Sequence, residues 1–194
     1  METTLSAADP VAFFASIPSS PDALLAARKD LMVDSDSASR FEAAVRGARE
    51  GGNTPASAAG SWVAGHYAKA LEASPCNDGL SLFIRIDSLR ELGQVEESAA
   101  LASGLPANSD STLAATALAA LADAGLWDEL KAGIKSASLS PEDKAYFNAI
   151  LSEVAGKYAD ACEAYEKILE KNPDHAWARF RLAFRADLHG DDEA

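Results

Sequence analysis

The sequence predicts an all-α fold in which helix hairpins stack on one another, and three observations support this prediction. The first is composition, since the 194 residues include 42 alanines but only 6 valines and 6 isoleucines. Alanine is the best helix former, whereas strands favour β-branched residues. The second is a set of helix-start signals, and the third is a regular spacing of glycines. Together they argue against a fold built on a β-sheet.

Four helix starts are predicted where a residue with a capping side chain precedes a proline. The side-chain oxygen accepts hydrogen bonds from free backbone N–H groups, and proline fits the first helical turn, where its missing donor is not needed. The four pairs are Asp9-Pro10, Ser20-Pro21, Thr54-Pro55 and Ser140-Pro141. In the N-terminal part of the chain, the sequence predicts helices near residues 10–17, 21–32 and 38–50.

Glycines at regular intervals mark the predicted helix ends. Gly93, Gly125, Gly156 and Gly190 are separated by 32, 31 and 34 residues. Glycine ends helices because it adopts positive φ without steric cost. Each interval has room for two helices of roughly 12–15 residues joined by short turns. A nearly constant interval of this length is typical of stacked repeats, each of which buries its apolar face against its neighbours.

One repeat, within residues 142–190, carries the clearest pattern. The second helix of this repeat shows the sequence Gly156, Tyr158, Ala161, Tyr165, Ile168, Leu169 and Pro173. Four of these residues, Tyr158, Ala161, Tyr165 and Ile168, form one stripe of a helix. The stretch resembles the tetratricopeptide repeat (TPR), with Ile168 in place of a consensus alanine. A second match, made by Tyr67, Ala70, Leu71 and Pro75, lies 98 residues upstream, and the resemblance covers roughly residues 55–194.

The resemblance implies a right-handed α-solenoid of stacked antiparallel helix hairpins over residues 54–194. Residues 1–53 do not match the repeat, and we expect them to form either an N-terminal helical cap or worn repeats. Residues 175–189 fit the first helix of one more repeat, which would be incomplete at the C-terminus. We therefore expect the natural chain to continue past Ala194.

In the TPR family, the first helix of each hairpin lines a concave groove that binds a segment of a partner. Carried over to this chain, the inward positions are Phe83, Asp87, Arg90, Tyr146, Ile150, Glu153, Trp177, Phe180, Arg181 and Phe184, with Ala115 and Ala119 between them. Arg181 resembles one position of the family's carboxylate clamp, but Phe147 and Thr116 stand where that clamp needs further donors. We therefore do not expect this groove to bind a C-terminal carboxylate.

The aromatic residues near the C-terminus have two interpretations. One helical stripe is formed by Trp177, Phe180 and Phe184. It is typical either of packing, including a packing surface that truncation has exposed, or of ligand recognition. A stripe left uncovered would favour self-association of the protein, because exposed apolar patches are association sites. Sedimentation at increasing concentration would detect such association.

Composition and motifs argue against catalysis and against several classes of ligand. The formal net charge of −13 disfavours binding to nucleic acids or anionic membranes. A protein needs a basic surface to bind either of them. The chain has no phosphate-binding loop or nucleophile elbow, and its His and Cys residues show no ligand spacing. We therefore expect no cofactor and no metal. No apolar run approaches the ~18 residues of a membrane span, and no signal peptide is evident, which predicts a cytoplasmic location.

The sequence thus predicts a non-catalytic scaffold that binds another protein or peptide in its concave groove. The acidic net charge favours a partner with a basic segment. One alternative is the N-terminal TPR module of a larger enzyme, whose catalytic domain would lie beyond residue 194. Another is a helical spacer or oligomerisation element.

Overall fold

The protein is all-helical in a computed structural model that describes residues 10–15, 20–31, 35–74, 78–106 and 108–189, where no strand occurs. The composition-based prediction of the all-α class is confirmed. Predictions on Asp9, Pro75, Cys76 and Gly190 lie outside the described residues. The described helices are α1 (Pro10–Ala15), α2 (Pro21–Leu31), α3 (Ser35–Glu50), α4 (Thr54–Val63), α5 (Tyr67–Glu72), α6 (Gly79–Glu91), α7 (Val95–Ser103), α8 (Ser111–Asp123), α9 (Trp127–Ser136), α10 (Pro141–Val154), α11 (Tyr158–Lys171) and α12 (Ala176–His189).

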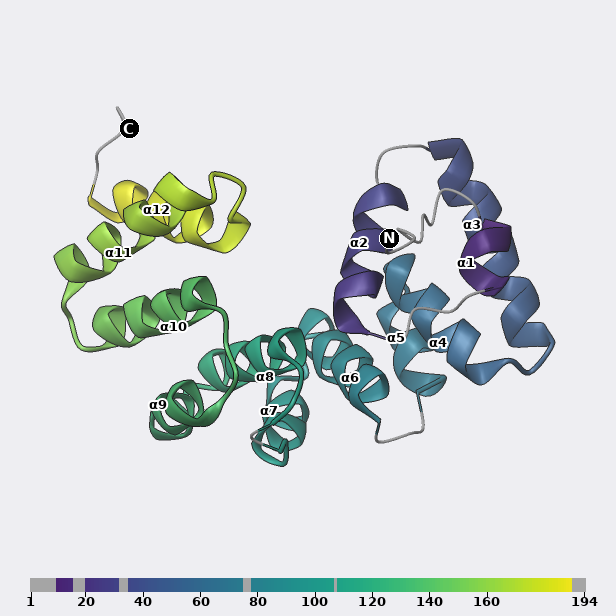
Figure 1. Cartoon of the computed structure of the whole chain (residues 1–194), viewed down its shortest axis with the longest axis horizontal. Coiled ribbons are helices and arrows are strands. Elements are labelled where there is room, and N and C mark those ends of the chain that lie inside the picture. Colours follow the sequence, from purple (N-terminus) through teal and green to yellow (C-terminus); the bar gives the residue numbers. More distant parts are fainter. Residues whose placement is uncertain (1–9, 16–19, 32–34, 75–77, 107, 190–194) are drawn as a thin grey trace.

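From α4 onward, helices that follow one another in the chain pack against each other. α4 packs on α5, α6 on α7, α8 on α9 and α10 on α11, and α12 packs on α11. The first helices of the first three pairs also touch, since α6 contacts both α4 and α8. Figure 1 shows the helices arranged along an open arc, with α1–α5 at one end and α10–α12 at the other. The two ends are thus separate in space, although an unbroken series of helix–helix contacts connects them.

The turns within the helix pairs share one hydrogen-bonded geometry. Gly65, Gly93, Gly125 and Gly156 all have positive φ, between 68° and 76°. The N–H of each glycine donates to the carbonyl three residues earlier, and the next N–H donates to the carbonyl five residues before itself. This is the Schellman motif, in which glycine avoids a Cβ clash. The sequence correctly placed helix ends at Gly93, Gly125 and Gly156 but missed Gly65.

The helix starts agree in part with the cap-proline prediction. Ser20 and Ser140 accept hydrogen bonds from the N–H groups of Ala23 and Asp143, as expected of N-caps. At the third described pair the position shifts by one residue, because α4 already includes Thr54 and its cap is Asn53. α6 and α8 begin after Asp78 and Asp110, whose carboxylates cap the helix without a following proline. These two caps have no proline and were therefore not predicted.

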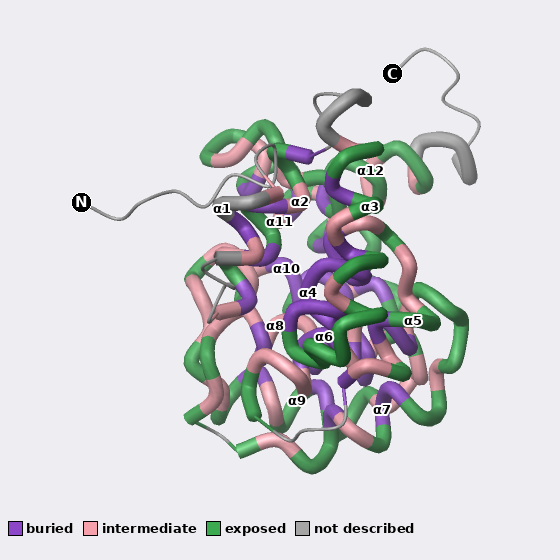
Figure 2. The backbone as a smooth tube through the Cα atoms, turned by 90° about the vertical axis from the view of Figure 1, so that its right-hand side faces the viewer, coloured by how far each residue is buried: buried purple, intermediate pink, exposed green. Residues whose placement is uncertain are grey.

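The centre of the N-terminal half is α4, which is buried on every side. All eight residues from Ala56 to Val63 are buried, and most of their side chains are small. Small side chains let α2, α3, α5 and α6 all pack against this one helix. Figure 2 shows such buried positions in the interior of the molecule and exposed positions around its rim. Trp62 is the large exception in α4, and its ring lies 5.1 Å from that of Phe83, measured between centroids.

Side chains of α1 and α3 approach the backbone of α4 very closely at Gly60. A Cβ atom at this position would lie 2.9 Å from Phe14 Cζ and 2.9 Å from Val45 Cγ2. Both distances are too short for carbon atoms in van der Waals contact, which prefer about 3.5–4.0 Å. Glycine at position 60 is therefore what allows α1 and α3 to approach α4.

Replacing Gly60 with alanine should destabilise the fold. The substitution gains up to about 1 kcal/mol in helix propensity, but inserting a methyl group into packed surroundings costs about 1–3 kcal/mol. Gly47→Ala is the matched control, because this glycine is also helical and nothing lies within 4 Å of the added Cβ. We expect Gly47→Ala to raise the free energy of unfolding in urea and Gly60→Ala to lower it. Equal effects would contradict the packing described for α4.

Candidate functional site

The ten residues predicted to face a partner occupy different environments in the structure. Phe83 and Ile150 are only 2% and 3% exposed. Both side chains belong to the apolar core, because neighbouring helices cover the faces of α6 and α10 on which these residues lie. They are therefore inaccessible to a partner, contrary to the expectation for a groove wall. Asp87, Arg90, Tyr146, Glu153 and Arg181 form polar contacts between helices, and Trp177, Phe180 and Phe184 are exposed.

The inner side of the arc is partly covered by α2. This helix packs across α4, α6 and α8, although α3 is its next neighbour in sequence. Its buried residues are Pro21, Leu24, Ala27 and Leu31, which repeat every three or four positions and form one face. Figure 1 shows α2 on the side of the N-terminal half that faces α12 across the opening of the arc. The sequence predicted the helix, and the contacts identify the helices that it covers.

Arg28 of α2 is held between two aromatic rings. Its guanidinium carbon lies 5.1 Å from the centroid of the Trp62 ring and 5.4 Å from that of Tyr67. The guanidinium also donates a hydrogen bond of 2.5 Å to the Tyr67 hydroxyl. A cation over an aromatic face is attracted by the negative face of the ring. Arg28 thus joins α2 to α4 and α5.

Asp87 and Arg90 of α6 extend these polar contacts from Trp62 of α4 to α8. Trp62 Nε1 donates to Asp87 Oδ2 at 2.9 Å, and Arg90 Nη1 lies 3.6 Å from Asp87 Oδ1. Arg90 Nε also donates to Asp123 Oδ2 of α8 at 2.8 Å. Burial raises the pKa of the Asp87 carboxyl, and this effect exceeds the opposing effects of the Trp62 hydrogen bond and the Arg90 charge. Two predicted groove residues therefore serve to join α4, α6 and α8.

The raised pKa of Asp87 predicts a pH-dependent effect of Asp87→Asn. Because the folded state binds this proton more tightly than the unfolded state, ionisation of Asp87 lowers stability as pH rises. Asparagine has no charge to desolvate and keeps an oxygen for Trp62. We expect Asp87→Asn to be more stable than the wild type at pH 7. The difference should disappear below the unfolded carboxyl pKa of about 3.9.

Urea unfolding of both proteins at the two pH values measures this difference. If Asp87→Asn is instead less stable at pH 7, the ion pair with Arg90 outweighs the cost of burying the charge.

A second polar cluster joins the last three helices around Glu153. This carboxylate is 5% exposed and accepts hydrogen bonds from Arg181 Nη1 at 2.9 Å and Arg185 Nε at 3.2 Å. Arg181 also bonds to Tyr146, whose pKa is raised by burial. The Arg185 guanidinium carbon lies 4.3 Å from the centroid of the Tyr158 ring. Arg181 is thus engaged within the chain, which is a different arrangement from an open carboxylate clamp.

The predicted stripe of α11 is only partly buried. Ala161, Tyr165 and Ile168 are core residues, as the helical spacing indicated. Tyr158, the first residue of the same stripe, is 43% exposed. The reason is that Tyr158 lies at the start of α11, where its ring pairs with Arg185 of α12.

Removing the Glu153 carboxylate should destabilise the C-terminal helices. Glu153→Ala removes the shared acceptor of Arg181 and Arg185, and a hydrogen bond to a charged group contributes about 1.5–3 kcal/mol. The control is Glu163→Ala, which removes an exposed ion pair with Lys167 on α11. We expect the urea midpoint to fall for Glu153→Ala and to stay unchanged for Glu163→Ala. Equal midpoints for the two variants would show that the cluster adds no stability.

Three exposed aromatic side chains lie in a row on α12, which we call the aromatic row (Trp177, Phe180 and Phe184). Their exposed fractions are 57%, 57% and 48%. The Phe180 and Phe184 rings are stacked with centroids 6.1 Å apart, and Trp177 meets Phe180 edge-on at 6.4 Å. Ala178 of the same helix is fully buried. α12 therefore packs on α11 and leaves the aromatic row uncovered in the part of the chain that the structure describes.

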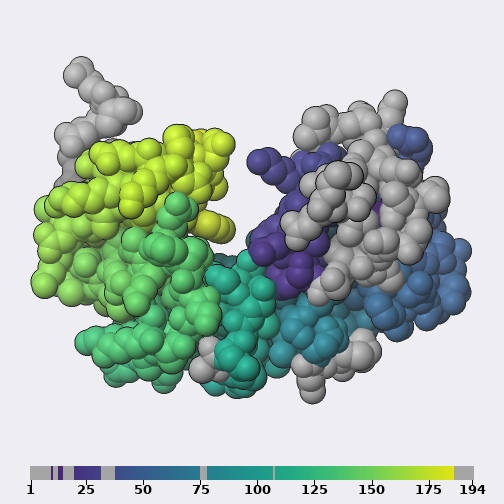
Figure 3. Space-filling model, viewed as in Figure 1, coloured from purple at the N-terminus to yellow at the C-terminus, as the bar shows by residue number. Residues whose placement is uncertain are grey.

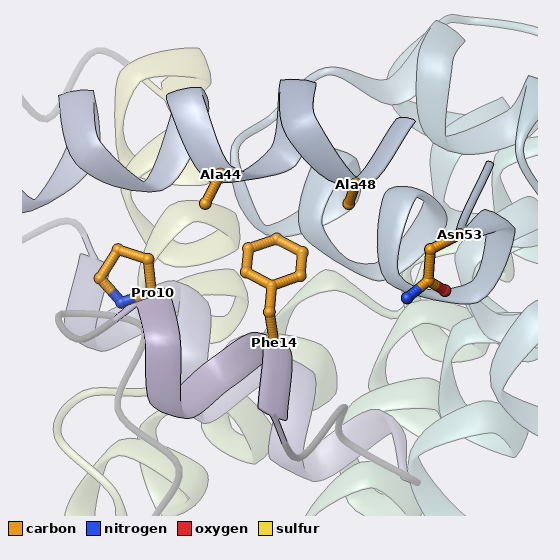
Figure 4. A pocket seen from close by; sticks show the side chains of 5 residues that line it. All are labelled: Pro10, Phe14, Ala44, Ala48 and Asn53. Carbon is orange, nitrogen blue, oxygen red and sulfur yellow. The ribbon is translucent and has the colours of Figure 1, made fainter. Parts of the chain in front are cut away.

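Two recesses occur elsewhere on the surface. One, of about 390 Å³, is lined by Pro10 and Phe14 of α1, Ala44 and Ala48 of α3, and Asn53 (Figure 4). The other, of about 590 Å³, lies between α7 and the end of α8 and contains Glu96 and Asp123 among alanines. The first offers one amide among apolar groups, and the second offers two carboxylates and the Ser103 hydroxyl.

The hollow between the ends of the arc is the largest concave feature visible in Figure 3, where α12 and α2 border it from opposite sides. Within the described ranges, no three His, Cys, Asp or Glu side chains come together in a way that could hold a metal ion. No described helix combines the length and the apolar character that a membrane span requires.

Comparison of the chain with protein-family models, with curated proteins and with solved structures gave no match. The TPR resemblance therefore rests on the residues of this chain alone. The function has to be argued from its surfaces.

Proposed function

We propose that this protein is a non-catalytic scaffold, an α-solenoid of TPR-like hairpins that binds a segment of another protein. Three features support the proposal: helix pairs with one repeated turn geometry, an open arc, and a surface rich in aromatic residues. The aromatic row carries the proposal. Five of the eight large apolar side chains exposed in the described residues belong to α10, α11 or α12, and three of them form this row.

Exposed aromatic residues in a row suit protein recognition. Trp and Phe bury a large area when they bind, and Trp in particular is common among the residues that dominate binding energy. Large exposed apolar patches are uncommon on monomeric proteins and mark interaction sites. With a net charge of −13, the protein would attract a partner with a basic segment and bind it faster at low salt. The same row also supports the prediction that copies of the protein self-associate.

Substitution of the aromatic row tests the proposal. A displayed library of amphipathic helical peptides is selected on the wild-type protein, and the enriched peptides are then measured against Trp177→Ser/Phe180→Ser. We expect the affinity of the enriched peptides to fall by at least about tenfold, which is ~1.4 kcal/mol. Stability should change little, because both side chains are more than half exposed. Affinity should also weaken as salt rises.

Trp127→Ser is the matched control, because Trp127 is 37% exposed but lies on α9. It should bind the peptides as the wild type does. Sedimentation of all three proteins shows whether the row pairs two copies instead. Peptides that bind the double variant and the control equally well would contradict the proposed surface.

A further inference from the structure

We propose that α4, α6 and α8 form a helix-binding site that α2 occupies within the same chain, and that an amphipathic helix of a partner with one basic residue displaces α2. The proposal rests on the proposed function for the existence of a partner. It concerns a surface separate from the aromatic row, so this proposal and the proposed function can fail independently.

α2 lies on the other helices in the way that a bound helix would. A helix bound in a groove presents anchors at about every third or fourth position to several elements at once. Leu24 and Ala27 are fully buried and Leu31 is 7% exposed, while α2 touches α4, α6 and α8. α2 thus covers residues of three successive helix pairs, as a bound helix would.

The central polar contact of α2 is made by a positively charged residue, Arg28. The site offers Arg28 the rings of Trp62 and Tyr67 and the hydroxyl of Tyr67. The Asp87 carboxylate accepts a hydrogen bond from Trp62 Nε1. Rings and a nearby carboxylate favour a cation at this position. A competing helix therefore needs a basic residue here. It also needs apolar residues four positions before it and three after it, and a small residue directly before it.

α2 is short, and one face of it is exposed to solvent. It has eleven residues, and helices of this length are marginally stable on their own. Its outward face is exposed, including Leu25 at 44%. The Asp22 carboxylate of α2 also accepts a hydrogen bond from the Thr112 hydroxyl of α8. Opening of α2 alone would therefore expose much less apolar surface than unfolding of α4, in which eight successive residues are buried.

Peptide binding to the full chain tests the proposal. The probe is a labelled synthetic peptide of residues 20–31, which matches α2. Leu24→Ala/Arg28→Ala in the protein weakens α2 in its site and raises the fraction of molecules with the site open. We expect this variant to bind the peptide at least about tenfold more tightly than the wild type does, because apparent affinity scales with the open fraction. The same peptide with alanine at position 28 should bind at least about tenfold more weakly, which is ~1.4 kcal/mol.

Leu25→Ala is the matched control, since Leu25 is next to Leu24 but points away from the site. The proposal predicts that Leu25→Ala binds the peptide no better than the wild type. It is overturned if the double variant keeps its helical circular dichroism but gains no affinity, or if all proteins bind the peptide equally.

Hydrogen exchange of the wild-type protein provides a test that does not depend on the variants folding. We expect the backbone amides of α2 to exchange at least about tenfold faster than those of α4 and α6, because α2 opens without them. Exchange of α2 and α4 at one common rate would show that α2 is an inseparable part of the fold. Loss of peptide binding to the aromatic row would leave both results unchanged, since that row lies on α12.

Discussion

The close approach of other helices to α4 is the constraint on which the N-terminal half depends. Four helices pack on α4, and this is possible because its buried positions are mostly Ala, Ser and Gly. Van der Waals contact falls off within an ångström, so a larger residue at Gly60 would separate α1 and α3 from the centre. α2 reaches the inner side of the arc because it too can lie against these short side chains.

Charged groups in the interior mainly connect helices to one another. Asp87, Arg90 and Glu153 all lie at inward positions predicted to meet a partner, yet each is engaged by residues of a neighbouring helix. A buried carboxylate is costly unless donors surround it. Glu153 meets this requirement with two arginines of α12 and thereby fixes how that helix lies on α10 and α11. The exposed large side chains among the predicted positions are consequently aromatic.

Local features of the fold could be predicted from the sequence, and long-range contacts could not. The turn at Gly125 depends on residues within one helix end, so its glycine was sufficient to locate it. The cap at Ser140 is equally local. By contrast, Glu153 and Arg181 are 28 residues apart, and α2 meets Thr112 some 90 residues away. Helical periodicity indicates which face of such a segment is apolar, but it does not identify what covers that face.

The three tryptophans sample separate parts of the molecule, and this makes the protein its own spectroscopic reporter. Trp62 is 1% exposed and lies next to Arg28, Trp127 is 37% exposed on α9, and Trp177 is 57% exposed on α12. Indole emission shifts to longer wavelength as water surrounds the ring. A soluble quencher added in small amounts would reach Trp177 first and Trp62 last. Intrinsic fluorescence therefore distinguishes events at the two ends of the arc without any attached dye.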